Sequence, residues 1–352
     1  MYNESFGLCK SPFSLTPDPA FLFLTEQHRE ALVGLTCAIL QRRGFAVLTG
    51  DAGTGKTTLL ARILQFLPAS RLQFSVILNT TLTPSEFLEL ALLDFGVTDV
   101  PSSKAQRLWK LRNLLLQGQR EGKVSALIVD EAHKLSPEVL EEIRMLGNFE
   151  EAEQKCLQIL LVGQSELDKT LNREELRQLK QRISVRLSLA PLAPTQVGEY
   201  IRHRWLRAGG TEHPFSTEAV EDVARASQGI PRVINALCDN ALISAFEQRS
   251  SRVLDSHVRE AAANLDLGEL PRRGVVVKPA APAAITVPSG SFPRPQETPP
   301  RDVNAGFDLL AAQLHHVYAT VSRIERSGTE SKWKRWTKWA GRLRFRPRHE
   351  ST

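Results

Sequence analysis

The sequence has 352 residues, of which 42% are hydrophobic and 24% are charged, and these proportions are ordinary for a globular protein. Its four cysteines are scattered without a CxxC pair, so the sequence indicates neither a zinc site nor a disulfide framework. It shows no secretory leader pattern and no apolar run of about 20 residues, so we expect a cytoplasmic protein without a membrane-spanning helix.

The formal net charge of +6 is concentrated at one end of the chain. Eight lysines and arginines lie between Lys332 and Arg348 with no acid among them, and they contribute +8. Subtracting this +8 from the total of +6 leaves −2 for the rest of the chain, which is therefore close to neutral. Any attraction to nucleic acid or to an anionic membrane is expected to reside in this tail.

The first 23 residues are rich in aromatic residues, prolines and turn formers, which excludes a long helix. The segment is too apolar for disorder, and we expect its phenylalanines to pack over the α/β core that follows. These are Phe6, Phe13, Phe21 and Phe23. Residues Thr25 to Leu40 then predict an amphipathic helix that Thr25 caps.

Residues 45–58 join a short apolar run to a loop that fits the phosphate-binding pattern GxxxxGK[ST] in full. In this pattern backbone N–H groups surround a polyphosphate, the lysine reaches the β- and γ-phosphates, and the hydroxyl ligates Mg²⁺. A buried strand before the loop and a helix after it favour this function over a chance glycine-rich turn. We therefore predict ATP and Mg²⁺ as cofactors, with Thr57 as a metal ligand. The predicted nucleotide-binding residues are Gly50, Asp51, Ala52, Gly53, Thr54, Gly55, Lys56, Thr57 and Thr58.

Three stretches around this loop resemble one known family. The opening YNESFGL, then PFSLTPDPAFLF and then HREAL, followed by a phosphate loop, are similar to the general secretion pathway protein A (ExeA-like) family of bacterial AAA+ ATPases. The resemblance covers about the first three quarters of the chain, to about Leu267. It implies a RecA-like parallel sheet with a small all-helical lid, ATP hydrolysis, and assembly into a homo-oligomeric ring or filament.

A second motif follows the apolar run at 124–129, which predicts a strand. An acid directly after a buried parallel strand lies at the carboxyl edge of the sheet, beside the phosphate loop. We expect Asp130 to hold hydrated Mg²⁺ and Glu131 to orient and activate the attacking water. This Walker B pattern, combined with the phosphate loop, favours hydrolysis over a solvated acidic turn. A lone histidine in a turn carries little information, so His133 is interpreted as a supporting or surface residue.

Two further assignments rest on the resemblance. Gln164 follows a predicted strand at 157–162 and matches the position called sensor 1, which holds the water or the γ-phosphate. Arg182 and Arg186 are expected one helical turn apart before a strand. The resemblance implies that an arginine here reaches the nucleotide of a neighbouring subunit. Arg186 is the first candidate and Arg182 the second, with surface arginines as the alternative interpretation.

After the α/β domain predicted at 1–194, the pattern becomes purely helical, so residues 195–267 are predicted to form the lid domain. Pro231 opens one of its helices, and Arg232 follows in the sequence GIPR. The resemblance implies that Arg232 is sensor 2, which contacts the γ-phosphate and couples lid position to nucleotide state. An arginine opposes the dipole at a helix start, which favours such a functional reason.

The remaining chain divides into three parts, which we expect to be largely disordered. Residues 268–305 form a Pro/Ala-rich linker without the means to bury a core. Residues 306–326 carry an a/d stripe typical of a coiled coil or of an amphipathic helix that folds back on the ATPase. Residues 331–348 place three tryptophans on one helical face and basic residues on the other. This pattern favours peripheral contact with an anionic membrane over nucleic acid or a solvated tail.

Two functions of different class follow from these patterns. The first is an ATPase that drives or times assembly of a bacterial envelope secretion or polysaccharide-export complex at the inner face of the cytoplasmic membrane. The second is a DNA-associated AAA+ regulator of the transposition or origin type. The N-terminal motifs and the near-neutral body favour the first. Glu131 argues against a third function, a nucleotide switch that hydrolyses slowly.

Overall fold

The computed structural model describes residues 2–67, 70–151 and 153–268. The predictions for the C-terminal linker, the amphipathic helix and the basic tail concern residues after 268 and lie outside these ranges. None of the helices that the structure describes combines the length and the apolar character needed to cross a membrane.

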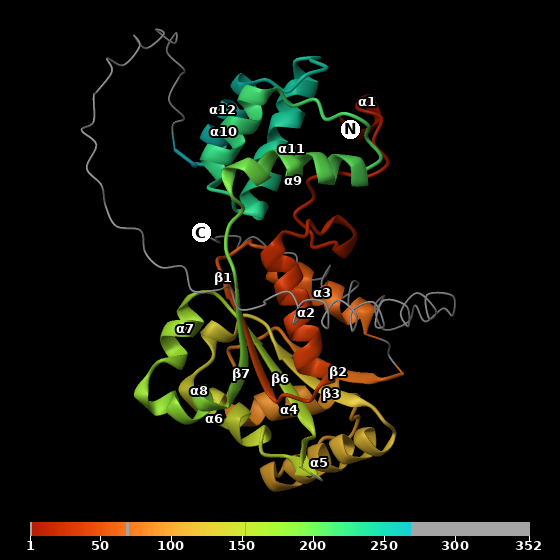
Figure 1. The fold of residues 1–352 in the computed structure, drawn as a ribbon, viewed down its shortest axis with the longest axis vertical. Coiled ribbons are helices and arrows are strands. Elements are labelled where there is room, and N and C mark those ends of the chain that lie inside the picture. The colour runs from red at the N-terminus through yellow and green to blue at the C-terminus, as the bar shows by residue number, and fades with distance from the viewer. Residues whose placement is uncertain (1, 68–69, 152, 269–352) are drawn as a thin grey trace, which may run out of the picture. The chain divides into compact units, whose positions relative to one another are not determined.

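The described residues contain a five-stranded parallel sheet in the order β2-β3-β6-β1-β7 (Figure 1). Every residue of β1, β3 and β6 is buried, as expected for central strands of a parallel sheet that is covered on both faces. The strands are β1 Phe45–Gly50, β2 Leu72–Ile77, β3 Val124–Val129, β6 Leu157–Val162 and β7 Ile183–Leu189. A separate antiparallel hairpin pairs β4 Glu150–Glu151 with β5 Gln154–Lys155.

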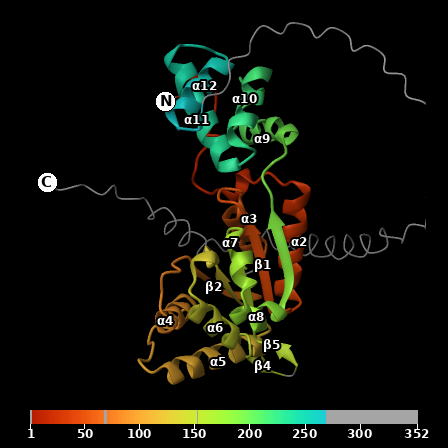
Figure 2. The same cartoon turned by 90° about the vertical axis from the view of Figure 1, so that its left-hand side faces the viewer.

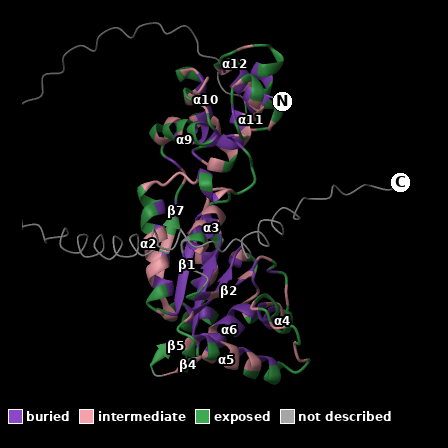
Figure 3. Cartoon of the chain, turned by 90° about the vertical axis from the view of Figure 1, so that its right-hand side faces the viewer, coloured by how far each residue is buried: buried purple, intermediate pink, exposed green. Residues whose placement is uncertain are grey.

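Two apolar clusters cover the two faces of the sheet, because side chains alternate along each strand. In β1, Phe45 and Val47 belong to one cluster, and Ala46 and Leu48 belong to the other. Figure 2 shows α2 on one side of the strands and α4 on the other, and Figure 3 shows the strands as buried between them. The first cluster packs against α4 Pro84–Asp94, α5 Lys104–Arg120 and α6 Pro137–Leu146, and the second against α2 Glu26–Leu40 and α3 Lys56–Phe66.

Short helical segments connect the later strands of the sheet. The single turn η2 Ala132–Lys134 follows β3 directly. Helix α7 Glu166–Leu171 follows β6, and the turn η3 Glu174–Leu176 and helix α8 Arg177–Arg182 lead into β7. These segments place the residues after β3 and β6 at the same edge of the sheet as the loop after β1.

Four further helices follow the sheet: α9 Pro194–Arg207, α10 Thr217–Ser227, α11 Pro231–Glu247 and α12 Asp255–Asn264. They supply most of a third apolar cluster. The side-chain oxygen of Ser216 caps α10 by accepting the N–H of Ala219. In the same bundle Asp222 is fully buried, and Arg259 of α12 contacts its carboxylate at 3.1 Å. This region is the one predicted as the lid.

The N-terminal segment, which contains α1 Tyr2–Ser5 and η1 Pro19–Phe21, contradicts its prediction. Its phenylalanines pack on the lid helices and not over the sheet. The Nε of Arg204 donates to the carbonyl of Pro12 at 2.5 Å, and its guanidinium lies 5.0 Å from the centre of the Phe21 ring. The physical reason is that α2, α3 and the α4–α6 layer already cover both faces of the sheet, whereas α9 offers aromatic partners.

Two aromatic residues of α9 make edge-on ring contacts with the N-terminal segment. Phe6 meets Trp205 edge-on with ring centres 5.9 Å apart, and Phe23 meets Tyr200 in the same manner at 5.8 Å. Tyr2 also donates a hydrogen bond from its hydroxyl to the Asp239 carboxylate of α11. The segment before α2 is therefore an integral part of the lid cluster.

Candidate active site

The phosphate-binding loop connects β1 to α3, which begins at Lys56. Gly55 is the N-cap residue of α3 with φ 100°, so the first N–H groups of that helix face the loop. Gly53 has φ 83°, a left-handed conformation that glycine adopts at little cost. This geometry supplies the ring of N–H donors and the positive helix end that favour bound phosphate.

The ammonium group of Lys56 is buried within this loop. Its Nζ donates to the carbonyl oxygens of Gly50 at 2.7 Å and Asp51 at 2.8 Å, and the residue is only 6% exposed. Burial lowers the pKa of Lys56, while the negative charges of Asp130 and Glu131 oppose that shift. The sheet edge thus brings a buried cation close to the two Walker B carboxylates.

The two predicted metal ligands meet directly. The hydroxyl of Thr57 donates to Oδ2 of Asp130 at 2.8 Å, and the N–H of Glu131 donates to Oδ1 of Asp130 at 2.9 Å. Asp130 is 4% exposed, and burial raises its pKa, which the hydrogen bond from Thr57 partly offsets. A hydroxyl oxygen and a carboxylate oxygen are the hard ligands that Mg²⁺ prefers, with water and phosphate completing its shell. The donor set therefore fits Mg²⁺.

Glu131 occupies an unusual backbone conformation immediately after β3. Its φ of 54° and ψ of 31° are left-handed, and its carboxylate is turned toward η2. Oε2 lies 2.9 Å from Nζ of Lys134 and 3.7 Å from Nε2 of His133. Burial acts to raise the pKa of Glu131, but its hydrogen bond to Lys134 and the surrounding positive charges outweigh burial and lower that pKa. Glu131 is therefore ionised at neutral pH.

Gln164 stands at the end of β6, next to the loop after β1. Gly163 donates its N–H to the carbonyl of Leu48 at 3.0 Å, which fixes the ends of the two strands side by side. The N–H of Gln164 donates to Nδ1 of His133 at 3.3 Å. The residue predicted as sensor 1 and the Walker B segment are thus joined through His133, which the sequence led us to interpret as a supporting or surface residue.

Arg232 reaches the phosphate loop from the lid. Its backbone N–H donates to the carbonyl of Gly53 at 3.3 Å. A Cβ atom built on Gly53 would lie 2.6 Å from the Cβ of Arg232, so the two segments approach closely enough to require glycine. Pro231 occupies the first position of α11 and directs this approach. The structure therefore brings the predicted sensor 2 residue to the loop.

The two arginines predicted as trans candidates are not one helical turn apart, which corrects that expectation. Helix α8 ends at Arg182 and β7 begins at Ile183, so Arg186 lies in the edge strand opposite Val47. The alternation of apolar and polar residues in ISVRLSL is a strand pattern, and it overrides the arginine-rich helix. Among the described residues, Arg182 bonds to the carbonyl of Arg144 and Arg186 pairs with Asp168 at 3.0 Å, and neither guanidinium bonds to the phosphate loop.

His28 of α2 contacts the backbone of the phosphate loop. The sequence did not indicate it as a site residue. It is 3% exposed, its Nε2 lies 3.3 Å from the carbonyl oxygen of Thr54, and its Nδ1 lies 2.6 Å from the hydroxyl of Thr25. Burial lowers the pKa of His28, so the ring is neutral, with Nε2–H donating to the loop. The sequence offered one signal, the stretch HREAL, but no spacing rule placed this ring under the loop.

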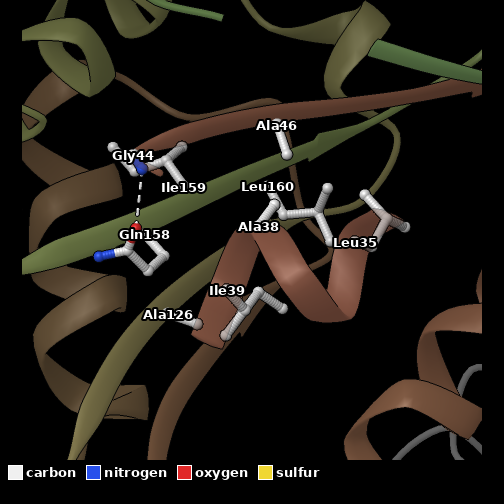
Figure 4. Close-up of a pocket in the computed structure, with 9 residues that line it drawn as sticks. All are labelled: Leu35, Ala38, Ile39, Gly44, Ala46, Ala126, Gln158, Ile159 and Leu160. Carbon is white, nitrogen blue, oxygen red and sulfur yellow. Dashed lines mark hydrogen bonds between the residues drawn. The ribbon is translucent and has the colours of Figure 1, made fainter. Parts of the chain in front are cut away.

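A small cavity lies between α2 and the sheet, away from these residues (Figure 4). Its wall is mainly aliphatic, with Leu35 and Ile39 of α2 facing Leu160 of β6. At one end the N–H of Gly44 donates to Oε1 of Gln158 at 2.8 Å. The cavity measures about 10 Å³, which is room for about one water molecule, so it does not serve as the nucleotide site.

Comparison with known proteins agrees with this geometry. Residues 39–171 match the AAA domain family. Over 263 residues the chain is 41% identical to the General secretion pathway protein A of Aeromonas hydrophila. The aligned region covers 74% of this chain and 48% of that protein. Residues 39–171 therefore form an AAA domain, and about three quarters of the chain are similar to a general secretion pathway protein A. The chain spans about half the length of that relative.

Two more distant similarities extend the comparison. The chain is 26% identical to the ATP-dependent target DNA activator B of Escherichia phage Mu, over 71% of this chain and 75% of that protein. The solved structure of the Aeropyrum pernix ORC2 protein in its ADPNP-ADP complexes superposes with a TM-score of 0.58 at 16% identity, and covers 72% of this chain and 71% of that one. The structural likeness confirms the predicted AAA+ fold class, and at this identity it shows the fold alone.

Proposed function

We propose that this chain is an ExeA-like AAA ATPase that binds ATP together with Mg²⁺ and hydrolyses it at the carboxyl edge of its sheet. The hydrogen bond between Thr57 and Asp130 carries the proposal, because it joins the two Walker motifs into one oxygen ligand pair. Lys56 and the ionised Glu131 lie beside that pair. A binding-only site would have no use for a carboxylate kept ionised next to the Mg²⁺ ligands.

Different residues of the proposed site bind the phosphates, bind Mg²⁺ and position the water. The loop N–H groups and Lys56 hold the phosphates, and Thr57 and Asp130 would hold Mg²⁺, which when bound neutralises charge on the phosphate oxygens. Glu131 orients a water for in-line attack on the γ-phosphorus, the bond from that phosphorus to the bridging oxygen breaks, and ADP leaves. The proton that the water loses passes to an oxygen of the released phosphate. Because the pKa of Glu131 is lowered, its main contribution is to position the water and stabilise positive charge on it.

Residues from the lid and from a second subunit complete the proposed site. Gln164 and Arg232 contact the γ-phosphate within one subunit, and the contact of Arg232 with Gly53 supports this role. Arg186, with Arg182 as the second candidate, reaches the nucleotide of the next subunit in a ring or filament. The half-exposed position of Arg186 in the edge strand supports a role toward another copy of the chain.

Dilution tests the arrangement between subunits. If an arginine acts in trans, turnover per subunit falls as the full chain is diluted through the micromolar range and its oligomers dissociate. Arg186→Ala should remove this concentration dependence and lower maximal turnover about 1000-fold, and Arg182→Ala provides the comparison. Turnover that stays constant while sedimentation shows a monomer would contradict the trans assignment.

A binding test addresses the nucleotide directly. Titration with a fluorescent ATP analogue should give saturable, Mg²⁺-dependent binding to the full chain. Lys56→Ala should weaken binding by about 100-fold, because a charge-assisted contact to the phosphates is lost. Lys110→Ala, which removes a surface lysine of α5 that pairs with Asp99, is the matched control and should leave affinity unchanged. Equal affinity of Lys56→Ala and the wild type would contradict the proposal.

The cellular role that we propose is to drive or time assembly of an envelope secretion or export complex, with the chain held peripherally at the inner membrane face by its basic tail. The 41% identity to a general secretion pathway protein supports this role. The tail-dependent part is tested by co-sedimentation of the full chain with anionic liposomes at physiological salt, compared with a version ending at Leu267. Equal pelleting of both versions would contradict membrane attachment through the tail.

A second candidate role is a DNA-associated regulator. The similarity to a protein named as a target DNA activator, over 75% of that protein's length, is the observation that favours it. Duplex DNA in place of liposomes in the same sedimentation experiment separates the two roles. Salt-dependent pelleting with DNA and none with liposomes would favour the DNA-associated role over the envelope role.

A further inference from the structure

The turn after β3 carries a histidine that the proposed mechanism does not use. His133 lies in η2, and its side chain is 10% exposed. One ring nitrogen faces the backbone of Gln164 and the other faces the carboxylate of Glu131. The ring therefore stands between two positions of the active site that belong to different strands, β3 and β6.

The hydrogen bond from the N–H of Gln164 fixes the tautomer of the neutral ring. A backbone N–H can only donate, so Nδ1 of His133 must present its lone pair at 3.3 Å. The neutral ring then carries its proton on Nε2, which lies 3.7 Å from Oε2 of Glu131. The partial positive charge of that N–H is directed at the carboxylate.

The surrounding backbone holds the ring in this place. Glu131 is left-handed at φ 54°, which turns its own side chain and the following residues back toward β6. A Cβ atom built on Gly163 would lie 3.1 Å from the backbone nitrogen of His133, so the turn is packed tightly against the end of β6. A shift of the residues after β6 must therefore move His133, and with it the contact to Glu131.

We propose that His133 is a positioning residue that transmits the position of the Gln164 backbone to the Glu131 carboxylate. His133 and Lys134 both approach Oε2 of Glu131. Both contacts fall on Oε2 of the carboxylate, so in the proposed reaction Oε1 is the oxygen that would take the attacking water. The inference rests on the proposed role of Glu131 in hydrolysis and adds a residue through which sensor 1 acts on it.

The test compares three substitutions of His133 in the full chain. His133→Ala should lower kcat about 10- to 100-fold with unchanged KM for ATP, as found when residues that orient a reactive group are removed. In His133→Asn the side-chain carbonyl can still accept from Gln164, so kcat should recover in part. His133→Gln keeps a donor near Glu131 but misplaces the acceptor, so it separates the two contacts. It also takes the place of His133→Ala if that variant does not fold.

His257 of α12 supplies a matched control. It is also a buried histidine whose Nδ1 accepts a backbone N–H, from Leu254 at 3.0 Å, and it belongs to the lid. His257→Ala should leave kcat within about twofold of the wild type, since it removes the same kind of contact away from the active site. A loss of kcat as large as that of His133→Ala would indicate a general effect of such contacts, which would overturn the inference.

A double-mutant cycle with Glu131→Gln distinguishes this inference from the proposed function. If His133 acts through Glu131, His133→Ala causes no further loss of the single-turnover rate in the Glu131→Gln background. An equal loss in both backgrounds, or wild-type kcat for His133→Ala while Glu131→Gln is inactive, would overturn the inference and leave the proposed function intact. Wild-type turnover by Glu131→Gln would instead overturn the proposed function.

Discussion

The carboxyl edge of the sheet and the lid are both well buried, but different forces hold them together. At the sheet edge the buried residues Lys56 and Asp130 are polar, and hydrogen bonds and charge fix them together with the half-buried Thr57. In the lid the buried residues are mostly aliphatic or aromatic, and Phe13 of the N-terminal segment is fully enclosed. Polar burial contributes little net stability, whereas apolar burial contributes much. Substitutions at the edge should therefore alter the reaction, and substitutions in the lid should alter folding.

Asp130→Asn should give the largest effect, a loss of turnover without a loss of stability. The amide loses the charge that would hold Mg²⁺, so we expect turnover to fall by about 1000-fold. Because burial raises the pKa of Asp130, the charged carboxylate is less stable in the fold than in the unfolded chain, so the uncharged amide should not lower the melting temperature. Phosphate release and thermal unfolding measure the two quantities. A clear drop in melting temperature would contradict the expectation that a substitution at the sheet edge alters the reaction without altering folding.

Phe13→Ala should give the converse result. Phe13 is 0% exposed and meets Phe215 edge-on at 5.9 Å, so we expect a loss of about 3–5 kcal/mol in the free energy of unfolding. Leu15→Ala is the matched control, because Leu15 is 55% exposed and should change stability by less than about 0.5 kcal/mol. Urea unfolding followed by circular dichroism measures both. Similar values for the two variants would show that the N-terminal segment is not part of the lid core.

Gly53→Ala tests the point at which the two regions touch. Gly53 has φ 83°, and a Cβ there would collide with Arg232 of the lid, so we expect ATP affinity to fall about tenfold. Gly122→Ala is the control, since Gly122 has φ 73° but a Cβ atom built on it would meet nothing within 4 Å. Titration with a fluorescent ATP analogue compares them. Equal affinities for the two variants would mean that the close contact between Gly53 and the lid does not affect ATP binding.

His28→Gln should give the smallest effect, which appears in the pH dependence of stability. The pKa of His28 is lowered in the fold, so the unfolded chain binds a proton more readily as pH falls through the ordinary value of about 6.5. His28 in its neutral form therefore contributes stability above that pH, and the contribution is lost as the solution becomes acidic. His28→Gln should show a smaller decline in the free energy of unfolding between pH 7.5 and 5.5. Parallel declines in both proteins would contradict the placement of His28 under the loop.

The sequence predicted the elements that depend on local patterns. The strands at 124–129 and 157–162 have the predicted bounds, because a buried central strand is a continuous apolar run that polar residues end abruptly. The helix after Thr25 begins where its capping residue indicates, with the Thr25 hydroxyl oxygen accepting the N–H of His28. The roles of the phosphate loop and Walker B residues remain predictions, but the loop lies where the motif requires.

The features that the sequence did not predict depend on distant neighbours. The first residues could pack on either domain, and only the aromatic face of α9 decides between them. The prediction of a helix at Arg186 is wrong, because the apolar–polar alternation of ISVRLSL decides the local structure and the four-residue spacing of two arginines does not. His28 and His133 are single histidines whose contacts, with Thr54 and with Gln164, cross from one element to another. No residue spacing encodes such contacts.

Phosphate release by the full chain and by Glu131→Gln, at saturating ATP and Mg²⁺, tests the central claim most directly. Glu131→Gln keeps the size of the side chain and removes its charge, so ATP affinity should stay within about threefold of the wild type. Phosphate release should fall at least about 100-fold, because the water is no longer positioned by a carboxylate. Equal rates of release for both proteins, or no release by the wild type in its oligomeric form, would contradict the account.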